Sequence, residues 1–219
     1  MSALLLALLL GAVLLALIAP NAPAQTRREG HPGVAGNERL TALAGAVLLA
    51  LIAVELVTIQ NIRALMSVHI FVGVLLAGPL AVKIASTGWR FVQYYTNNPA
   101  YRRKGPPRPL QRVLSPPLLI SSIVVVGSGI GLATTSPGDQ GVLHRVHLLS
   151  FLVWAVLVGI HVLAYLRRVP GLIASDWRHD RLQQAPRRGH RLAVNLAALT
   201  AGAIAAILVL PAFTAWIHW

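Results

Sequence analysis

The chain lacks cysteine altogether and has only six acidic residues among its 219. Without thiols it forms no disulfide, no thiolate zinc site and no iron–sulfur cluster, and catalysis by a cysteine nucleophile is excluded. The six acids are scattered along the chain, so no paired-carboxylate or Ser/His/Asp arrangement can be assembled from them. Hydrolytic chemistry of these common types therefore has no candidate residues.

Charge is also scarce for a chain of this length. Only 11% of the residues are charged, against about a quarter in a typical soluble domain, while 56% are hydrophobic. Long apolar runs alternate with clusters of arginine, a pattern that indicates repeated membrane spans. The net charge of +13 would suggest nucleic acid only if this hydropathy were ignored. In a membrane protein, arginine-rich loops are topology signals, and we expect no nucleic-acid partner.

Six candidate spans are bracketed by charged residues, at about 3–20, 39–63, 64–87, 112–139, 145–167 and 191 to the C-terminus. Each is close to the roughly 20 residues that a helix needs to cross the hydrocarbon. None alternates polar and apolar residues, so the expected fold is an all-α polytopic transmembrane bundle. We divide it into an N-terminal helix with a basic loop, residues 1–38, and a bundle, residues 39–219.

Two segments have particular interpretations. Residues 22–24 resemble a signal-peptidase site, but residues 3–20 lack a positive n-region, so we favour a retained helix over a cleaved signal peptide. Residues 97–110 are rich in Pro, Gly and Arg, which predicts a non-helical loop on the lipid headgroups or in solvent.

Arginines define the expected orientation. Loops 21–39, 88–112 and 167–191 hold most of them and fall on one side, whereas the other side has only Arg63 and Arg145. The positive-inside rule places the arginine-rich loops in the cytoplasm, as in a multi-pass protein of the cell inner membrane. Spans 64–87 and 145–167 then both run from outside to inside, in parallel.

Histidines within the spans provide the main functional signal. His147 and His161 lie fourteen residues apart, which brings them within about 40° of one face and separates them by about 21 Å along the axis. His69 and Lys83 have the same separation on the parallel span. His69 is therefore expected at the depth of His147, and Lys83 at the depth of His161.

Two helices that offer histidines at equal depth can bind a haem between them, with one imidazole on each side of the iron. Space for the macrocycle is expected from Gly73, one turn from His69, and from Gly127 and Gly131. Arg145 and Arg63 stand at the outer rim, where they either pair with haem propionates or are ordinary surface charges. Any haem would be haem b, held without covalent attachment.

The remaining polar groups leave alternatives open. Lys83 opposite His161 would ligate, pair with a propionate, or extend to the cytoplasmic surface, so one haem is expected and a second stays open. Glu55 either serves a proton or quinone site or bonds to a neighbouring helix, and the latter is favoured. His144 is a spare ligand candidate whose expected place is the rim.

Residues 69–73 (HIFVG), 86–91 (STGWRF), 99–107 (PAYRRKGPP) and 147–151 (HLLSF), together with His161, resemble a group of bacterial predicted cytochrome b membrane proteins. The resemblance covers roughly residues 69–166. It implies a four-helix haem core similar to the membrane subunits of formate dehydrogenases and hydrogenases, with His69, His147 and His161 as iron ligands. The chain departs from the group at Tyr165, where a further histidine is usual, and at Gly78, where proline is usual.

The expected function is that of a b-type cytochrome that carries electrons between a quinone pool or a partner redox subunit and another component, within or across the membrane. Such a chain could be the electron-transfer subunit of an oxidoreductase and not a complete enzyme. The alternatives are a proton-coupled or metal transporter and a structural membrane subunit whose histidines only pack.

Overall fold

The computed structural model describes residues 31–106, 109–135, 141–166 and 188–212. In these ranges the chain forms helices and no strands, which confirms the predicted all-α class. The helices are α2 (Pro32–Gln60), α3 (Ile62–Leu75), α4 (Ala77–Tyr95), α5 (Pro99–Lys104), α6 (Pro109–Ala133), α7 (Gly141–Leu166) and α9 (Arg188–Val209). The predicted span 3–20, with its signal-peptide alternative, and most of the loop 167–191 lie outside the described residues.

Five of the described segments are long and apolar enough to cross a membrane: α2, the pair α3–α4, α6, α7 and α9. Large apolar side chains also point outward; Val113 is 77% exposed and Leu208 is 74% exposed. Such a surface would be costly in water and is at no disadvantage in hydrocarbon. The helices therefore indicate a membrane protein, as the hydropathy predicted.

The span expected at residues 64–87 is longer than predicted and is broken in the middle. It runs over 34 residues as α3 and α4, and α3 ends at Leu75. Pro79 has no N–H to donate to the Leu75 carbonyl, so the helical hydrogen-bond ladder is interrupted there. Helix α9 approaches α4 very closely at the same place. A Cβ on Gly78 would lie only 2.0 Å from the Ala198 carbonyl oxygen. Glycine thus allows direct backbone contact between the two helices.

The prediction that residues 97–110 are not helical is wrong. Helix α5 occupies six of these residues, and α6 begins at Pro109. The Asn98 side chain caps α5 by accepting a hydrogen bond of 3.0 Å from the Ala100 N–H, and proline follows as the first helical residue. Gly105, with a φ of 80°, ends the helix in a conformation that favours glycine.

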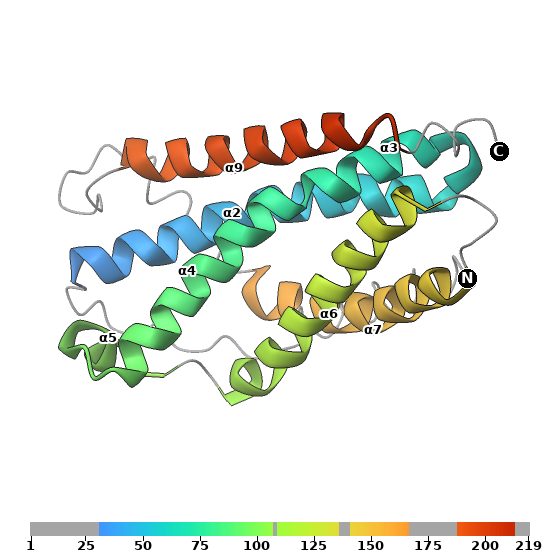
Figure 1. Ribbon diagram of the computed structural model, residues 1–219. Helices are drawn as coiled ribbons and strands as arrows, with labels where there is room; N and C mark the ends of the chain where they lie inside the picture. Colours follow the sequence, from blue (N-terminus) through green and yellow to red (C-terminus); the bar gives the residue numbers. More distant parts are fainter. Residues whose placement is uncertain (1–30, 107–108, 136–140, 167–187, 213–219) are drawn as a thin grey trace.

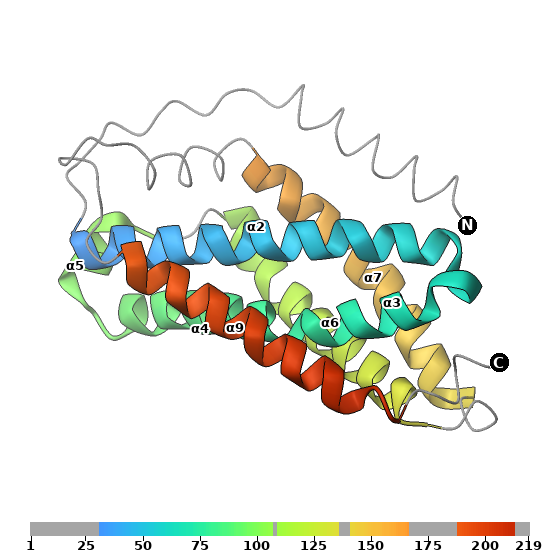
Figure 2. The same ribbon diagram turned by 90° about the horizontal axis from the view of Figure 1, so that it is seen from above.

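The helices form two groups, one of α2, α3, α4 and α9 and the other of α6 and α7 (Figures 1 and 2). Helix α6 lies along α7, and α2 lies along α3 and α4, while α3 also touches α6. Helix α9 covers the outer side of α3 and α4. Both views show α3–α4 and α7 running in one direction and α2, α6 and α9 in the other. The parallel course predicted for the two histidine-bearing spans is therefore observed.

Candidate cofactor site

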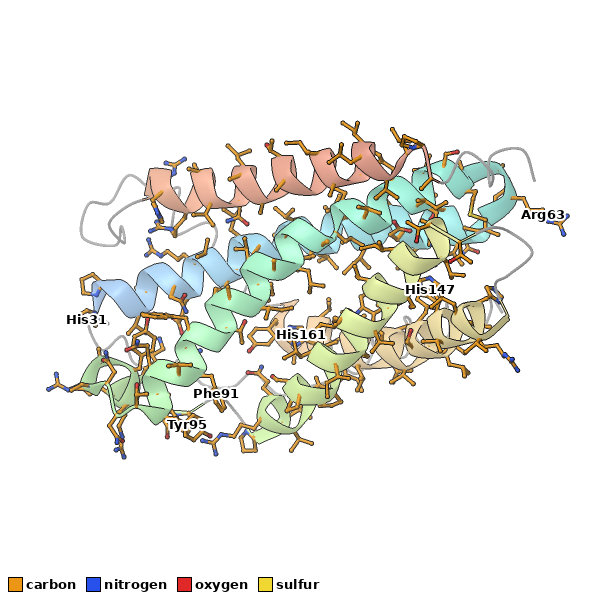
Figure 3. All side chains as sticks on the ribbon, viewed as in Figure 1. His31, Arg63, Phe91, Tyr95, His147 and His161 are labelled. Atoms are coloured by element: carbon orange, nitrogen blue, oxygen red, sulfur yellow. The ribbon has the colours of Figure 1, made fainter. Side chains whose placement is uncertain are left out.

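A large cavity of about 2080 Å³ lies between the two groups of helices. Typical ligand pockets measure about 300–1,000 Å³, so this one has room for a large ligand. Its walls come from α2, α3, α4, α6 and α7 and are mainly apolar. His69, Lys83, His147 and His161 all line it, and Figure 3 shows His147 and His161 at separate positions along α7. The structure thus brings the four polar residues of the sequence prediction to one internal space.

His69 on α3 and His147 on α7 face each other across the cavity. Their ring centroids are 6.4 Å apart and their ring planes make an angle of 79°. When two imidazoles bind one metal from opposite sides with metal–nitrogen bonds of about 2.0 Å, their ring centres lie about 6.3 Å apart. The observed separation therefore fits a pair of axial ligands on one iron without movement of either helix.

The ring of His69 is held from α2. Its Nδ1 contacts the carboxylate Oε2 of Glu55 and lies 3.1 Å from the Thr58 hydroxyl. A carboxylate only accepts hydrogen bonds, so Nδ1 carries a proton and donates it to Glu55; in a neutral ring Nε2 then keeps its lone pair. A Cβ on Gly73 would lie 3.7 Å from Oε1, the other carboxylate oxygen of Glu55, which is an ordinary van der Waals distance. Metal-binding histidines usually show this arrangement, in which the second ring nitrogen donates to a carboxylate or carbonyl.

The ring of His147 is held in the same way from α6. Its Nδ1 lies 3.0 Å from the backbone carbonyl oxygen of Val125 and 3.1 Å from the Ser128 hydroxyl. Ser128 already donates to the Val124 carbonyl at 2.6 Å, which leaves its oxygen free to accept. His147 therefore also carries its proton on Nδ1 and presents an unprotonated Nε2. The favoured prediction for Glu55, a bond to a neighbouring helix, agrees with its contact with His69, whereas Thr58, Val125 and Ser128 were not assigned to these roles from the sequence.

The glycine that accommodates His147 is Gly129 and not the pair expected from the sequence. A Cβ on Gly129 would lie 3.0 Å from the Cε1 atom of His147. Gly127 is exposed and nothing lies within 4 Å of a Cβ built on it, and a Cβ on Gly131 would contact the Leu143 side chain. The expectation that Gly127 and Gly131 leave space for the macrocycle is therefore wrong. Their spacing correctly placed them on one face of α6, but it is the opposite face that meets the cavity.

The half of the cavity near His161 has a different character. Lys83 donates a hydrogen bond of 2.9 Å to the backbone carbonyl of Thr41 on α2, and a Cβ on Gly45 would lie only 2.8 Å from the ammonium. Its side chain thus joins α4 to α2 and does not extend to the surface, so that alternative for Lys83 is not the one observed. His161 has the ring of Tyr165 at 4.9 Å between centroids. Among the residues that the structure describes, no second histidine faces His161 as His69 faces His147.

The rim residues differ in position. Arg63 is exposed and lines the cavity mouth, and so does the exposed His144. Arg145 is exposed, donates from Nε to the carbonyl of Gly141 at 3.0 Å and is not among the cavity-lining residues. In the part of the chain that the structure describes, no three His or acidic side chains come together to hold a bare metal ion. Two histidines suffice for a metal already held by a macrocycle.

Comparison with known proteins gives no match: no family model fits the chain, and neither the curated proteins nor the solved structures include a similar one. The class of protein therefore follows from the fold alone. It is a helical protein with five segments long and apolar enough to cross a membrane, and these helices line a large cavity with two facing histidines.

Proposed function

We propose that the chain is a membrane-bound b-type cytochrome in which His69 and His147 are the two axial ligands of one haem. The observation that carries this proposal is the 6.4 Å separation of the two rings inside the cavity. It is supported by the hydrogen bonds at both Nδ1 atoms, which in neutral rings leave each Nε2 available to a metal. The apolar walls suit the faces of a porphyrin.

In this proposal the haem supplies one-electron chemistry, and the chain supplies its surroundings. The two histidines fix the axial positions, and the helices α2 and α6 fix the histidines. The apolar lining keeps water away and lowers the local dielectric, which together with the ligands sets the potential. Electrons would pass between a quinone pool or a partner redox subunit and another subunit.

We propose one haem for each chain. The site at His161 differs from the outer one, since the ring beside it belongs to Tyr165 and the Lys83 ammonium is engaged by the Thr41 carbonyl. Tyrosine and lysine are rarer haem ligands than histidine in electron carriers. The outer pair is therefore the one assigned to iron. The orientation proposed here keeps the arginine-rich loops in the cytoplasm of a bacterial-type inner membrane.

The decisive experiment is expression with an adequate haem supply and purification in detergent. We expect a Soret band, a b-type pyridine haemochrome and a haem-to-protein ratio near one. His69→Ala and His147→Ala should each lose the haem, because each variant lacks one of the two ligands. His144→Ala is the matched control, since this histidine lines the same cavity from α7 with an exposed side chain.

Three results would contradict the proposal. Colourless wild-type protein from haem-replete cells would exclude a haem-binding function. Full haem retention in both ligand variants would exclude the assigned pair, and loss of haem in His144→Ala alone would transfer the role of α7 ligand to that histidine.

A further inference from the structure

Glu55 is a buried acid near the C-terminal end of α2. Its side chain belongs to α2, the residue is only 8% exposed, and one carboxylate oxygen, Oε2, contacts Nδ1 of His69 on α3. The other oxygen, Oε1, has no hydrogen-bond partner in the part of the chain that the structure describes. A carboxylate in such a place has a high desolvation cost, which its bonds to other groups must offset.

Thr58 fixes the position of this carboxylate. It lies one turn after Glu55 on α2 and is buried, and its hydroxyl is 2.7 Å from the Glu55 backbone carbonyl oxygen and 3.2 Å from Oε2. The same hydroxyl is 3.1 Å from Nδ1 of His69. Carboxylate, hydroxyl and imidazole therefore form one connected group that joins α2 to α3.

The two opposed histidines are thus held by unlike acceptors. His69 meets a charged carboxylate, whereas His147 meets the neutral carbonyl of Val125 and the hydroxyl of Ser128. A hydrogen bond to a charged acceptor is roughly twice as strong as one to a neutral acceptor. It also increases the electron density of the imidazole more, so the two rings are expected to differ as electron donors.

We infer that Glu55 is a positioning residue for His69: it holds the ring as the Nδ1–H tautomer with Nε2 directed to the cavity, and its negative charge makes His69 the stronger donor of the pair. The part of this inference that concerns the iron rests on the proposed function. The part that concerns the tautomer does not, because it describes the haem-free protein.

The tautomer is tested without haem. Protein labelled with ¹⁵N-histidine is prepared from haem-deficient cells, and the His69 signals are assigned by their loss in His69→Ala. We expect a protonated Nδ1 and a bare Nε2 in the wild type, and a mixture of tautomers in Glu55→Leu. Thr58→Val is the matched control that retains the carboxylate, and its His69 should remain Nδ1–H. A proton on Nε2 in the wild type, or an unchanged tautomer in Glu55→Leu, would overturn the inference.

The effect of the charge is tested on the haem-loaded protein. Glu55→Gln keeps an acceptor of similar shape and removes the charge, so the midpoint potential should rise and haem affinity should fall by roughly 10–100-fold. Glu38→Gln, a change of the same kind on the same helix, should leave both values at those of the wild type. A wild-type potential and affinity in Glu55→Gln would refute the charge effect. Colourless wild-type protein would refute the haem proposal instead, and the tautomer measurement would still decide the role of Glu55.

Discussion

The substitution Gly129→Ala tests how closely α6 approaches His147. The added Cβ would lie 3.0 Å from Cε1 and 3.4 Å from Nδ1 of the ring. Ordinary carbon–carbon contacts begin near 3.5 Å, so the ring must move by about half an ångström. Metal–ligand distances tolerate deviations of only about 0.2 Å. A single methyl group therefore displaces His147 by more than axial ligation allows.

The cost of this displacement can be expressed as affinity. Inserting a methyl group into a well-packed interior costs about 1–3 kcal/mol. The largest effect arises when the whole cost falls on binding, in which case haem affinity drops roughly 5- to 150-fold. Movement of α6 away from α7 would relieve the clash at the expense of the bonds from His147 to Val125 and Ser128.

The assay is titration of haem into haem-free protein in detergent, followed by the Soret absorbance. Gly127→Ala is the control on the same helix, since nothing lies within 4 Å of its added Cβ. We expect wild-type affinity in the control and weaker binding in Gly129→Ala. If Gly129→Ala is folded and binds haem as tightly as the control, the close approach of α6 to the ring is not what positions His147.

Two further predictions concern the bundle itself. Gly78→Ala should lower the thermal unfolding temperature in detergent, because its Cβ would lie 2.0 Å from the Ala198 carbonyl oxygen, and Gly88→Ala, with nothing within 4 Å, should leave that temperature unchanged. A stable Gly78→Ala variant would mean that α9 does not pack on α4 as described. Lys83→Met should retain the haem at wild-type stoichiometry and lose the hydrogen bond from the ammonium to the Thr41 carbonyl, worth about 1.5–3 kcal/mol of stability by chemical denaturation. Loss of haem in this variant would make Lys83 part of the cofactor site.

Several features of the fold could be predicted because a helix converts sequence spacing into position along one axis. Apolar runs of sufficient length predicted the membrane spans, and the separations of His69 from Lys83 and of His147 from His161 predicted which groups share a depth. The observed neighbours agree for His69 and His147. Helix α5 could also have been predicted, because Asn98 followed by proline is an N-terminal capping signal. The Pro/Gly/Arg-rich composition of the segment instead indicated a loop.

Rotation of each helix about its own axis could not be predicted. Helix α6 carries mainly apolar and small residues around its circumference, as lipid permits, so little amphipathic pattern marks its inward face. Gly127 and Gly131 are one turn apart on one face, and Gly129 lies nearly opposite. Only the packing of α6 against α7 decided that Gly129 faces His147.

The sequence by itself determined that this is a helical membrane protein with histidines at matched depths, because hydropathy and helical spacing are local properties of the chain. The tertiary structure alone decided which groups hold those histidines: Glu55 reaches His69 from α2, and the Val125 carbonyl reaches His147 from α6. These partners lie 14 and 22 residues away along the chain and on other helices. Their meeting depends on how the helices pack, and no local pattern of residues encodes it.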